Sequence, residues 1–340
     1  MSDRIDVAVV GATGVVGEAM LEILNQRKFP VGKLYALASE RSVGTRVAFG
    51  SRQLDVENLA DFDFSKVAIG LFSAGGSVSA EFAPKAAAAG CIVIDNTSHF
   101  RRDDDIPLVV PEVNADAIAD YKARGIIANP NCSTIQMLVA LKPIYDAAGI
   151  ERINVCTYQA VSGAGRSAVE ELVRQTAALM NGRPLELEGD TKQIGFNAVP
   201  HIDQFMDNRY TREEMKMVWE TRKILNDDEI QVNPTTVRIP VFYGHSEAVH
   251  IETRDKISTE SVLELLANAP GIEVLDGVET GQYPTAVTEA SGTDPVFVGR
   301  IREDISHPRG INLWVVADNI RKGAALNSVQ IAEILAKNYL

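Results

Sequence analysis

The chain has 340 residues, with 33 lysine and arginine residues against 46 aspartate and glutamate residues, a formal net charge of −13 and 46% hydrophobic residues. This composition is typical of a globular protein with a sizeable core and two domains, and it excludes a disordered or fibrous chain. The acidic balance argues against a nucleic-acid partner. The amino terminus lacks a signal-peptide pattern, and no apolar run approaches the ~18 residues of a membrane span, which predicts a cytoplasmic protein without a membrane partner.

The first third of the chain predicts a doubly wound parallel sheet, because short β-branched runs alternate with helical patterns. The expected strands cover residues 5–10, 33–39, 67–73, 91–96 and 125–130. The expected helices between them cover residues 17–26 and 79–90. We therefore predict an N-terminal Rossmann-like domain at residues 1–131.

The remainder predicts a second domain of α+β type at residues 132–318. Its expected helices cover residues 134–149 and 166–180, and its expected strands cover residues 153–162, 235–244 and 245–254. A further helix begins at Thr211, since Glu214 three residues later completes a capping box. The last segment, 319–340, ends in an amphipathic helix that we expect to pack back on the first domain and complete it.

A glycine-rich turn, GATGVVG, connects the first strand to the first helix. Glycines allow a tight turn and a close approach of the backbone to a pyrophosphate, and the helix N-terminus then offers unpaired N–H groups to that anion. The predicted cofactor contacts of this turn are Gly11, Thr13, Gly14, Val15, Val16 and Gly17. The spacing is GxxGxxG and not the commoner GxGxxG, so an ordinary turn between a strand and a helix is the alternative.

The second strand ends where an NAD enzyme usually places an acidic residue on the adenosine ribose. Here Ser39, Arg41 and Ser42 occupy that place, and a guanidinium with hydroxyls suits a 2′-phosphate. These residues favour NADP over NAD. Glu40 argues the other way, because a carboxylate facing the ribose would repel a phosphate.

Cys132 is the candidate nucleophile of the sequence. It lies in NPNCST between a strand and a helix, where the helix N-terminus favours the thiolate form. Cys91 and Cys156 lie in apolar strands, where a cysteine is usually an inert core residue. The three cysteines form neither a CxxC pair nor a zinc cluster, so no metal is expected.

Two further residues suit chemistry at a thiol. In RIPVFYGHSEAV a strand would carry Arg238, and a turn at Gly244 would present His245. A histidine shuttles protons, and an arginine pairs bidentately with a carboxylate. Taken singly, a surface arginine and a loop histidine would be the simpler interpretation of these residues.

Ten ordered motifs together resemble those of the aspartate-β-semialdehyde dehydrogenase family. They are GATGVVG, SAGGS, NTSHFR, PLVVPEVN, NPNCST, YQAVSGAG, FNAVPHID, EEMK, RIPVFYGHSEAV and DNIRKGAA, and they span nearly the whole chain. Any one of these motifs alone would leave several dehydrogenases open.

The resemblance implies a role for each matching residue. Cys132 matches the family's nucleophile, and His245 matches its general acid/base. The implied substrate-binding residues are Arg101, Asn131, Gln159, Glu213, Lys216 and Arg238, with Arg101 and Lys216 on the phosphate. The implied further cofactor contacts are Ser73, Gly75, Ser162, Gly163 and Asn319. Without the resemblance, Glu213 and Lys216 would be first-turn charges of a capped helix, and Arg101 with Arg102 a solvated basic pair.

The resemblance also implies the reaction. An enzyme of this family reduces L-4-aspartyl phosphate with NADPH to L-aspartate 4-semialdehyde and phosphate, through a thioester on Cys132, in the biosynthesis of lysine, diaminopimelate, threonine, methionine and isoleucine. The second domain would be catalytic and would form most of a homodimer contact. An N-acetyl-glutamyl phosphate reductase, with one more methylene in its substrate, is the nearest alternative enzyme. A catalytically silent dinucleotide-binding relative is the alternative from another class.

Overall fold

The computed structural model describes residues 4–187, 189 and 191–340, and these residues form two compact units. The first unit contains the described residues up to Asn131 together with Gly323–Leu340, and the second unit contains Cys132–Lys322. The chain thus returns to the first unit at Gly323, four residues after the predicted position. Asn319 stays in the second unit because its side chain bonds with Ser162 and with the main chain of Gly244.

The first unit is built on a seven-stranded sheet of order β3-β4-β2-β1-β5-β6-β7. Its strands are β1 (Ile5–Val10), β2 (Val31–Ala38), β3 (Arg46–Phe49), β4 (Arg52–Asn58), β5 (Ile69–Phe72), β6 (Ile92–Asp95) and β7 (Ile126–Ala128). All neighbours pair in parallel except β3 with β4, which form an antiparallel hairpin at the edge. The order reverses at β1, which is where ligands bind in open α/β sheets.

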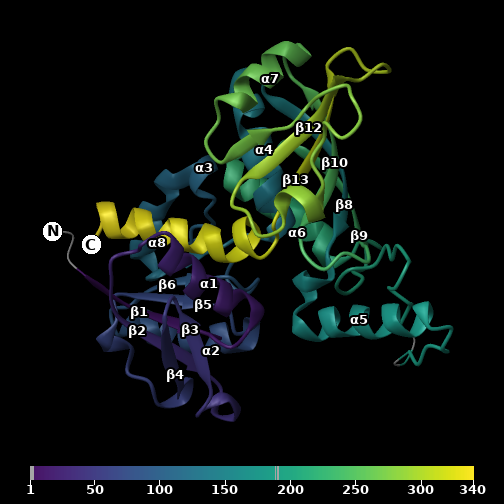
Figure 1. Ribbon diagram of the computed structural model, residues 1–340. Coiled ribbons are helices and arrows are strands. Elements are labelled where there is room, and N and C mark those ends of the chain that lie inside the picture. The colour runs from purple at the N-terminus through teal and green to yellow at the C-terminus, as the bar shows by residue number, and fades with distance from the viewer. Residues whose placement is uncertain (1–3, 188, 190) are drawn as a thin grey trace. The chain divides into compact units, whose positions relative to one another are not determined.

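Helices cover both faces of this sheet (Figure 1). They are α1 (Val15–Gln26), α2 (Gly76–Ala88), the short α3 (Pro111–Asn114) and α8 (Leu326–Asn338), with 3₁₀ turns at Glu40–Ser42, Leu59–Asp61, Phe64–Lys66 and Ala115–Ala123. Val7 and Val9 of β1 belong to one apolar cluster with Met20 of α1 and Val329 of α8. Because side chains alternate along a strand, the intervening Ala8 and Val10 face the other side. The expected packing of the C-terminal helix in this unit is confirmed.

The second unit is built on a six-stranded sheet of order β11-β12-β13-β10-β8-β9. Its strands are β8 (Ile150–Gln159), β9 (Gln231–Arg238), β10 (His245–Thr253), β11 (Ile272–Val274), β12 (Val296–Glu303) and β13 (Gly310–Ala317). The pairs β8 with β9 and β11 with β12 are parallel, and the others are antiparallel. Its helices are α4 (Cys132–Ala148), α5 (Arg166–Met180), α6 (Arg212–Leu225) and α7 (Thr259–Ala267), with short helical turns at Val161–Ala164 and Ala286–Ala290. A further helical turn, Arg321–Ala325, spans the point where the chain returns to the first unit.

The predicted elements agree with the structure except at some ends. The strand expected at 235–244 begins at Gln231 and ends at Arg238, because Pro240 lacks the N–H group that a ladder needs. The strand expected at 153–162 ends at Gln159, where a 3₁₀ turn follows. The predicted capping box is present: Oγ1 of Thr211 accepts the N–H of Glu214, whose carboxylate accepts the N–H of Thr211.

Candidate active site

The glycine turn of the first unit has the backbone that a close approach to an anion requires. Gly11 has a φ of +84°, and a Cβ there would lie 2.9 Å from the carbonyl carbon of Ser73. A Cβ at Gly17 would lie 2.1 Å from the oxygen of Gly11. Gly14 is the N-cap of α1 and has no side chain to satisfy the helix amides. Those amides are therefore free of a side-chain cap at the end where a phosphate would bind.

The other cofactor candidates of the first unit follow neighbouring parallel strands. β2 and β5 flank β1, so their carboxyl ends meet the glycine turn at one edge of the sheet. Ser39 and Arg41, exposed after β2, come from one side. Ser73 comes from the other, where its N–H donates to the oxygen of Val10 at 2.9 Å. Gly75, with a φ of +99°, is the N-cap of α2. This edge fits a dinucleotide phosphate.

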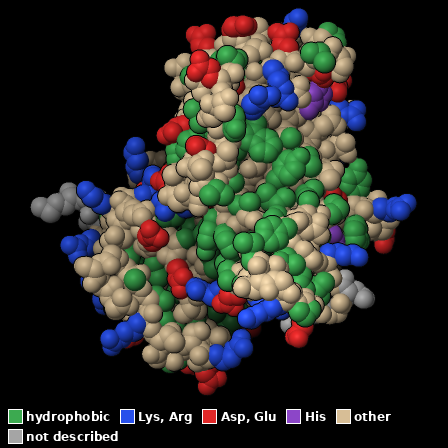
Figure 2. All heavy atoms as spheres, turned by 45° about the vertical axis from the view of Figure 1, so that its right-hand side comes forward, with side chains coloured by type: hydrophobic (Ala, Val, Ile, Leu, Met, Phe, Trp, Pro, Cys, Tyr) green, Lys and Arg blue, Asp and Glu red, His purple; other side chains and the backbone are tan. Residues whose placement is uncertain are grey.

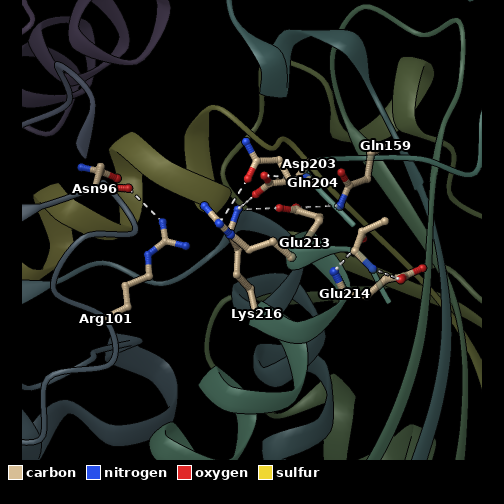
Figure 3. Close-up of polar contacts among 10 residues, drawn as sticks. Asn96, Arg101, Gln159, Asp203, Gln204, Glu213, Glu214 and Lys216 are labelled. Carbon is tan, nitrogen blue, oxygen red and sulfur yellow. Dashed lines mark hydrogen bonds and ion pairs between the residues drawn. The ribbon is translucent and has the colours of Figure 1, made fainter. Parts of the chain in front are cut away.

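Arg101 is nearly buried, with 8% of its surface exposed. Its Nη2 donates to the main-chain oxygen of Asn96 at 2.9 Å (Figure 3). This bond holds the side chain across the loop that follows β6. Asn131 is also buried, at the end of the segment that leads to Cys132. A solvated basic pair is therefore not the environment of Arg101.

Cys132 is the first residue of α4 and is half-buried. Its neighbour Ser133 accepts a hydrogen bond of 2.5 Å from Nε2 of Gln159, at the end of β8. Cys132 also lies near enough to Arg238 to influence its pKa electrostatically. The pKa of Arg238 is lowered by burial, while Glu213 and Cys132 oppose that effect. The candidate thiol therefore shares its surroundings with a glutamine and an arginine.

Arg238 and His245 converge on one glycine. A Cβ on Gly163 would lie 3.3 Å from Nη1 of Arg238 and 3.5 Å from Nε2 of His245. Nη1 of Arg238 donates to the oxygen of Ala160 at 2.6 Å. Gly244, with a φ of +88°, turns the chain so that His245 starts β10, as predicted.

The ring of His245 is fully buried and has a defined proton position. The N–H of Ala160 donates to its Nδ1 at 3.0 Å, so the proton of the neutral ring lies on Nε2. Nε2 itself has no hydrogen-bond partner among the described residues. Burial, together with the charge of Arg238, lowers the pKa of His245 to about 3, although Glu213 acts in the opposite direction. His245 is a neutral donor near neutral pH.

Glu213 and Lys216 form a largely buried ion pair near the start of α6. Nζ of Lys216 lies 2.9 Å from Oε2 of Glu213 and 2.9 Å from Oδ2 of Asp203, and Nε2 of Gln159 donates to Oε1 of Glu213 at 3.3 Å (Figure 3). Burial alone would lower the pKa of Lys216, but the two carboxylates outweigh it and the net pKa is raised. First-turn charges of an exposed helix would not be enclosed in this way.

Ser162 and Asn319, both predicted to contact the cofactor, contact each other. Nδ2 of Asn319 donates to Oγ of Ser162 at 3.0 Å, and Oδ1 accepts the N–H of Gly244 at 2.9 Å. Both side chains are almost completely buried. The second unit therefore brings its predicted residues together around the ends of β8 and β9 and the start of β10.

Two residues of this cluster, Ser133 and Asp203, were not predicted from the sequence. Ser133 directly follows the candidate nucleophile Cys132, and its bond to Gln159 depends on a strand that is remote in sequence. Asp203 lies in the FNAVPHID motif, but only the tertiary structure shows that it pairs with Lys216. Burial raises the pKa of Cys91 to about 12, consistent with the prediction of an inert thiol. No set of three or more His, Cys, Asp or Glu side chains in the described residues is arranged to hold a metal ion.

The fold is that of a dinucleotide-binding oxidoreductase, and comparisons with known proteins agree. Residues 6–121 match the family model "Semialdehyde dehydrogenase, NAD binding domain", and residues 141–322 match "Semialdehyde dehydrogenase, dimerisation domain". The chain is 64% identical to aspartate-semialdehyde dehydrogenase of Legionella pneumophila, over 100% of this chain and 98% of the relative. It is 63% identical to aspartate-semialdehyde dehydrogenase 2 of Vibrio cholerae, over 100% of both.

Solved structures show the same similarity. Aspartate semialdehyde dehydrogenase II of Vibrio cholerae, complexed with ASA, superposes with a TM-score of 0.97 at 62% identity and covers 100% of both chains. Aspartate semialdehyde dehydrogenase of Candida albicans, with NADP, has a TM-score of 0.78 at 26% identity, over 99% of this chain and 100% of that chain. The chain belongs to the aspartate-semialdehyde dehydrogenase family.

The predicted family, two-domain α/β fold and enzyme class are therefore confirmed. The chain is an oxidoreductase that binds a nicotinamide dinucleotide and a small-molecule substrate, and its family acts in amino-acid biosynthesis. The comparisons do not favour an N-acetyl-glutamyl phosphate reductase. Among the described residues, no helix has both the length and the apolar character needed to cross a membrane.

Proposed function

We propose that this chain reduces L-4-aspartyl phosphate to L-aspartate 4-semialdehyde and phosphate, with NADPH as the preferred reductant. The observation that carries the proposal is the convergence of Arg238 and His245 on Gly163, beside a thiol at the N-terminus of α4. A carboxylate-binding cation, a proton donor and a nucleophile are the groups that an acyl transfer to a thiol needs.

The chain's residues divide the work as follows. Cys132 attacks the acyl carbon and expels phosphate, which Arg101 and Lys216 bind. The resulting thioester holds the acyl carbon in place, so that one difficult displacement becomes two easier steps. Arg238 binds the α-carboxylate, while Gln159 and Asn131 orient the acyl group and Glu213 the amino group.

We assign His245 the role of proton donor. Its Nε2 proton is available to the oxygen of the acyl carbon, because Nδ1 is occupied by the N–H of Ala160. The nicotinamide, when bound, supplies the hydride that reduces the thioester. The neutral ring of His245 then stabilises the oxyanion while Cys132 is released.

The preference for NADP rests on the segment after β2. Arg41 is exposed with Ser39, where a guanidinium and a hydroxyl would meet the 2′-phosphate. The relative from Candida albicans, whose structure is named as containing NADP, supports the same choice. We assign the rest of the dinucleotide to the glycine turn, to Ser42, to Ser73 and Gly75, and to Ser162, Gly163 and Asn319.

The experiment is phosphate-dependent reduction of NADP by the purified protein with L-aspartate 4-semialdehyde. Parallel reactions use NAD, and N-acetyl-glutamate semialdehyde as the alternative substrate. Activity with aspartate semialdehyde and NADP, and much less with either replacement, is the expected result. Binding of NADPH without turnover of any substrate would instead support the silent dinucleotide-binding relative.

We further propose a cytoplasmic homodimer that assembles through the second unit. That unit matches a model described as a dimerisation domain. It leaves large apolar side chains exposed, among them Phe205, Phe242 and Tyr283. Figure 2 shows hydrophobic side chains gathered in the middle of the view. Such patches are typical of interfaces. Sedimentation equilibrium at several concentrations should give twice the chain mass, whereas a monomer mass throughout would contradict the proposal.

A further inference from the structure

Asp95, the last residue of β6, is a completely buried acidic side chain that the assignment above does not use. Its neighbours in the sheet are Phe72 at the end of β5 and Ala128 at the end of β7. It therefore lies at the carboxyl edge of the first unit. Two segments to which we assign ligand binding start from this edge. They are the turn at Ser73–Gly76, assigned to the cofactor, and the loop 96–101, which carries Arg101.

The carboxylate of Asp95 accepts hydrogen bonds from both segments. Oδ1 accepts the hydroxyl of Ser79, in the first turns of α2, at 2.7 Å. Oδ1 also accepts the N–H of Thr97 at 3.1 Å, and Oδ2 accepts the hydroxyl of Thr97 at 2.8 Å. One side chain thus joins the helix that begins at Gly75 to the loop that carries Arg101.

The contact of Asp95 with Thr97 is connected to the guanidinium of Arg101 through the neighbouring residue Asn96. Thr97 follows Asn96, whose main-chain oxygen accepts Nη2 of Arg101 at 2.9 Å. Asn96 is also fixed by its N–H, which donates to Phe72, and by its side chain, which donates to Ser328 of α8. Fixing Thr97 therefore fixes the acceptor that orients Arg101.

We propose that Asp95 is a positioning residue that holds two subsites in register: the cofactor turn through Ser79, and the phosphate-binding Arg101 through Thr97. The proposal rests on the proposed function, since it assumes that the turn binds NADP and that Arg101 binds phosphate. A buried carboxylate is costly unless its bonds are satisfied, and here its described donors come from two different functional segments. If these bonds only stabilised the fold, loss of the Ser79 hydroxyl and loss of the Thr97 hydroxyl would change NADPH binding and phosphate binding alike.

The two arms of the junction are separable by mutation. Ser79→Ala removes only the bond to α2, and we expect the Kd for NADPH to rise about fivefold while the KM for phosphate changes less than about twofold. Thr97→Val keeps the main-chain N–H but removes the hydroxyl, and we expect the reverse pattern. Asp95→Ala should raise both constants by about tenfold or more, and Asp95→Asn, which keeps one acceptor oxygen, should restore most of the loss.

The readouts are a fluorescence titration of NADPH, which needs no turnover, and the dependence of NADP reduction on inorganic phosphate. The matched control is Asp63→Ala, because Asp63 also accepts an N–H and a hydroxyl, but both come from Ser65, two residues along the chain, and not from the two ligand-binding segments. Asp63→Ala should change neither constant. Thermal unfolding of each variant shows whether it is folded. If Asp95→Ala does not fold, Ser79→Ala and Thr97→Val still test the proposal, because each removes one hydroxyl only.

Two results distinguish the proposal from its premise. A wild-type chain without phosphate-dependent NADP reduction would overturn the proposed function itself. A fully active wild type whose Ser79 and Thr97 variants change both constants alike, or neither, would overturn the positioning role of Asp95.

Discussion

At the scale of single residues, Gly163 lies beside both the proposed proton donor, His245, and the proposed carboxylate-binding residue, Arg238. A Cβ there would lie tightly against Nη1 of Arg238, at 3.3 Å, and in ordinary contact with the ring of His245, at 3.5 Å. The glycine therefore leaves room for a substrate between the two groups. The cation in turn keeps the ring neutral, because the charge of Arg238 adds to burial in lowering its pKa.

Replacing the nucleophile should separate chemistry from binding. We expect Cys132→Ser to lower kcat by about 10³-fold or more, since a hydroxyl is a far weaker nucleophile, while the Kd for NADPH stays the same. Cys156→Ser, at a half-buried strand position, is the matched control and should keep its activity. Stopped-flow detection of a thioester in the wild type completes the measurement; full turnover by Cys132→Ser would exclude the assigned role.

Replacing the anchor should act mainly on substrate binding. Arg238→Lys keeps a cation but loses the planar fork that pairs with a carboxylate, so we expect the KM for aspartate semialdehyde to rise by about 10- to 100-fold. Steady-state kinetics at saturating NADP and phosphate provide the measurement. Arg152→Lys, at a half-buried position near the other end of β8, serves as the control and should leave KM unchanged. An unchanged KM in Arg238→Lys would remove Arg238 from the substrate site.

The buried imidazole has a predicted titration. Because its pKa is lowered to about 3, the ring of His245 should stay neutral from pH 8 to pH 5. An NMR titration of the ring protons, with His245→Gln to assign the signal, provides the measurement. A signal of His245 that titrates near 6.5 would show that the ring is solvated and not a fixed neutral donor.

At the scale of elements, α6 connects local helix chemistry to the site. Its capping box at Thr211 fixes the first turn, and that turn carries Glu213 and Lys216. Glu214 of the box also accepts the N–H of Thr236 on β9, so the helix start is tied to the sheet. A sequence pattern that predicts where a helix begins thus also positions an ion pair of the site.

Removing this cap should change both stability and function. Thr211→Ala should lower the free energy of unfolding by about 1 kcal/mol, the usual effect of losing an N-cap. It should also raise the KM for phosphate, since Lys216 lies one turn away. Ser258→Ala removes the N-cap of α7, which accepts the N–H of Ser261, and should lower stability alone. Urea unfolding gives the stability of both variants, and steady-state kinetics give their KM for phosphate. The same KM in Thr211→Ala and Ser258→Ala would mean that the α6 cap has no local role in the site.

At the scale of the whole molecule, the second unit buries a carboxyl group that resists ionisation. Glu247 of β10 is completely buried, and its carboxyl oxygens have no described hydrogen bond of ordinary geometry. Burial raises the pKa of Glu247 well above 4.5, although contact with Gln136 of α4 opposes the effect. The unfolded chain releases this proton near pH 4.5, but the folded chain keeps it.

This difference makes global stability depend on pH. The raised pKa contributes stability that is fully present below about pH 4.5 and is lost as pH rises, by at most about 1.4 kcal/mol per pH unit. Glu247→Gln cannot ionise, so the free energy of unfolding should fall less between pH 5 and pH 9 than in the wild type. Glu252→Gln, on the opposite face of β10, is the control. Urea unfolding across this range checks the slope, and identical slopes in wild type and Glu247→Gln would contradict the prediction.

Several parts of the fold were not predicted. The hairpin of β3 and β4 lies at the edge of its sheet, where the mostly exposed, polar residues of β4 give no buried-strand pattern. The strands β11, β12 and β13 pair in an order that the chain sequence does not reveal. Edge position and strand order depend on partners far away in sequence, and a local pattern contains no information about them.

The sequence by itself determined the features that depend on neighbours along the chain. These are the glycine turn between β1 and α1, the thiol at the start of α4, the turn at Gly244 before His245, and the capping box of α6. Backbone sterics and helix-end hydrogen bonding act within a few residues, so a local pattern is sufficient.

Only the tertiary structure decided which groups meet and which are buried. It brought Asp203 to Lys216, Gln159 to Ser133, and Asp95 to both Ser79 and Thr97. The energies of such contacts depend on desolvation and on distances between segments that are remote in sequence. For that reason the sequence predicted the chemical groups of the site, and the folded chain determined their partners, charges and proton positions.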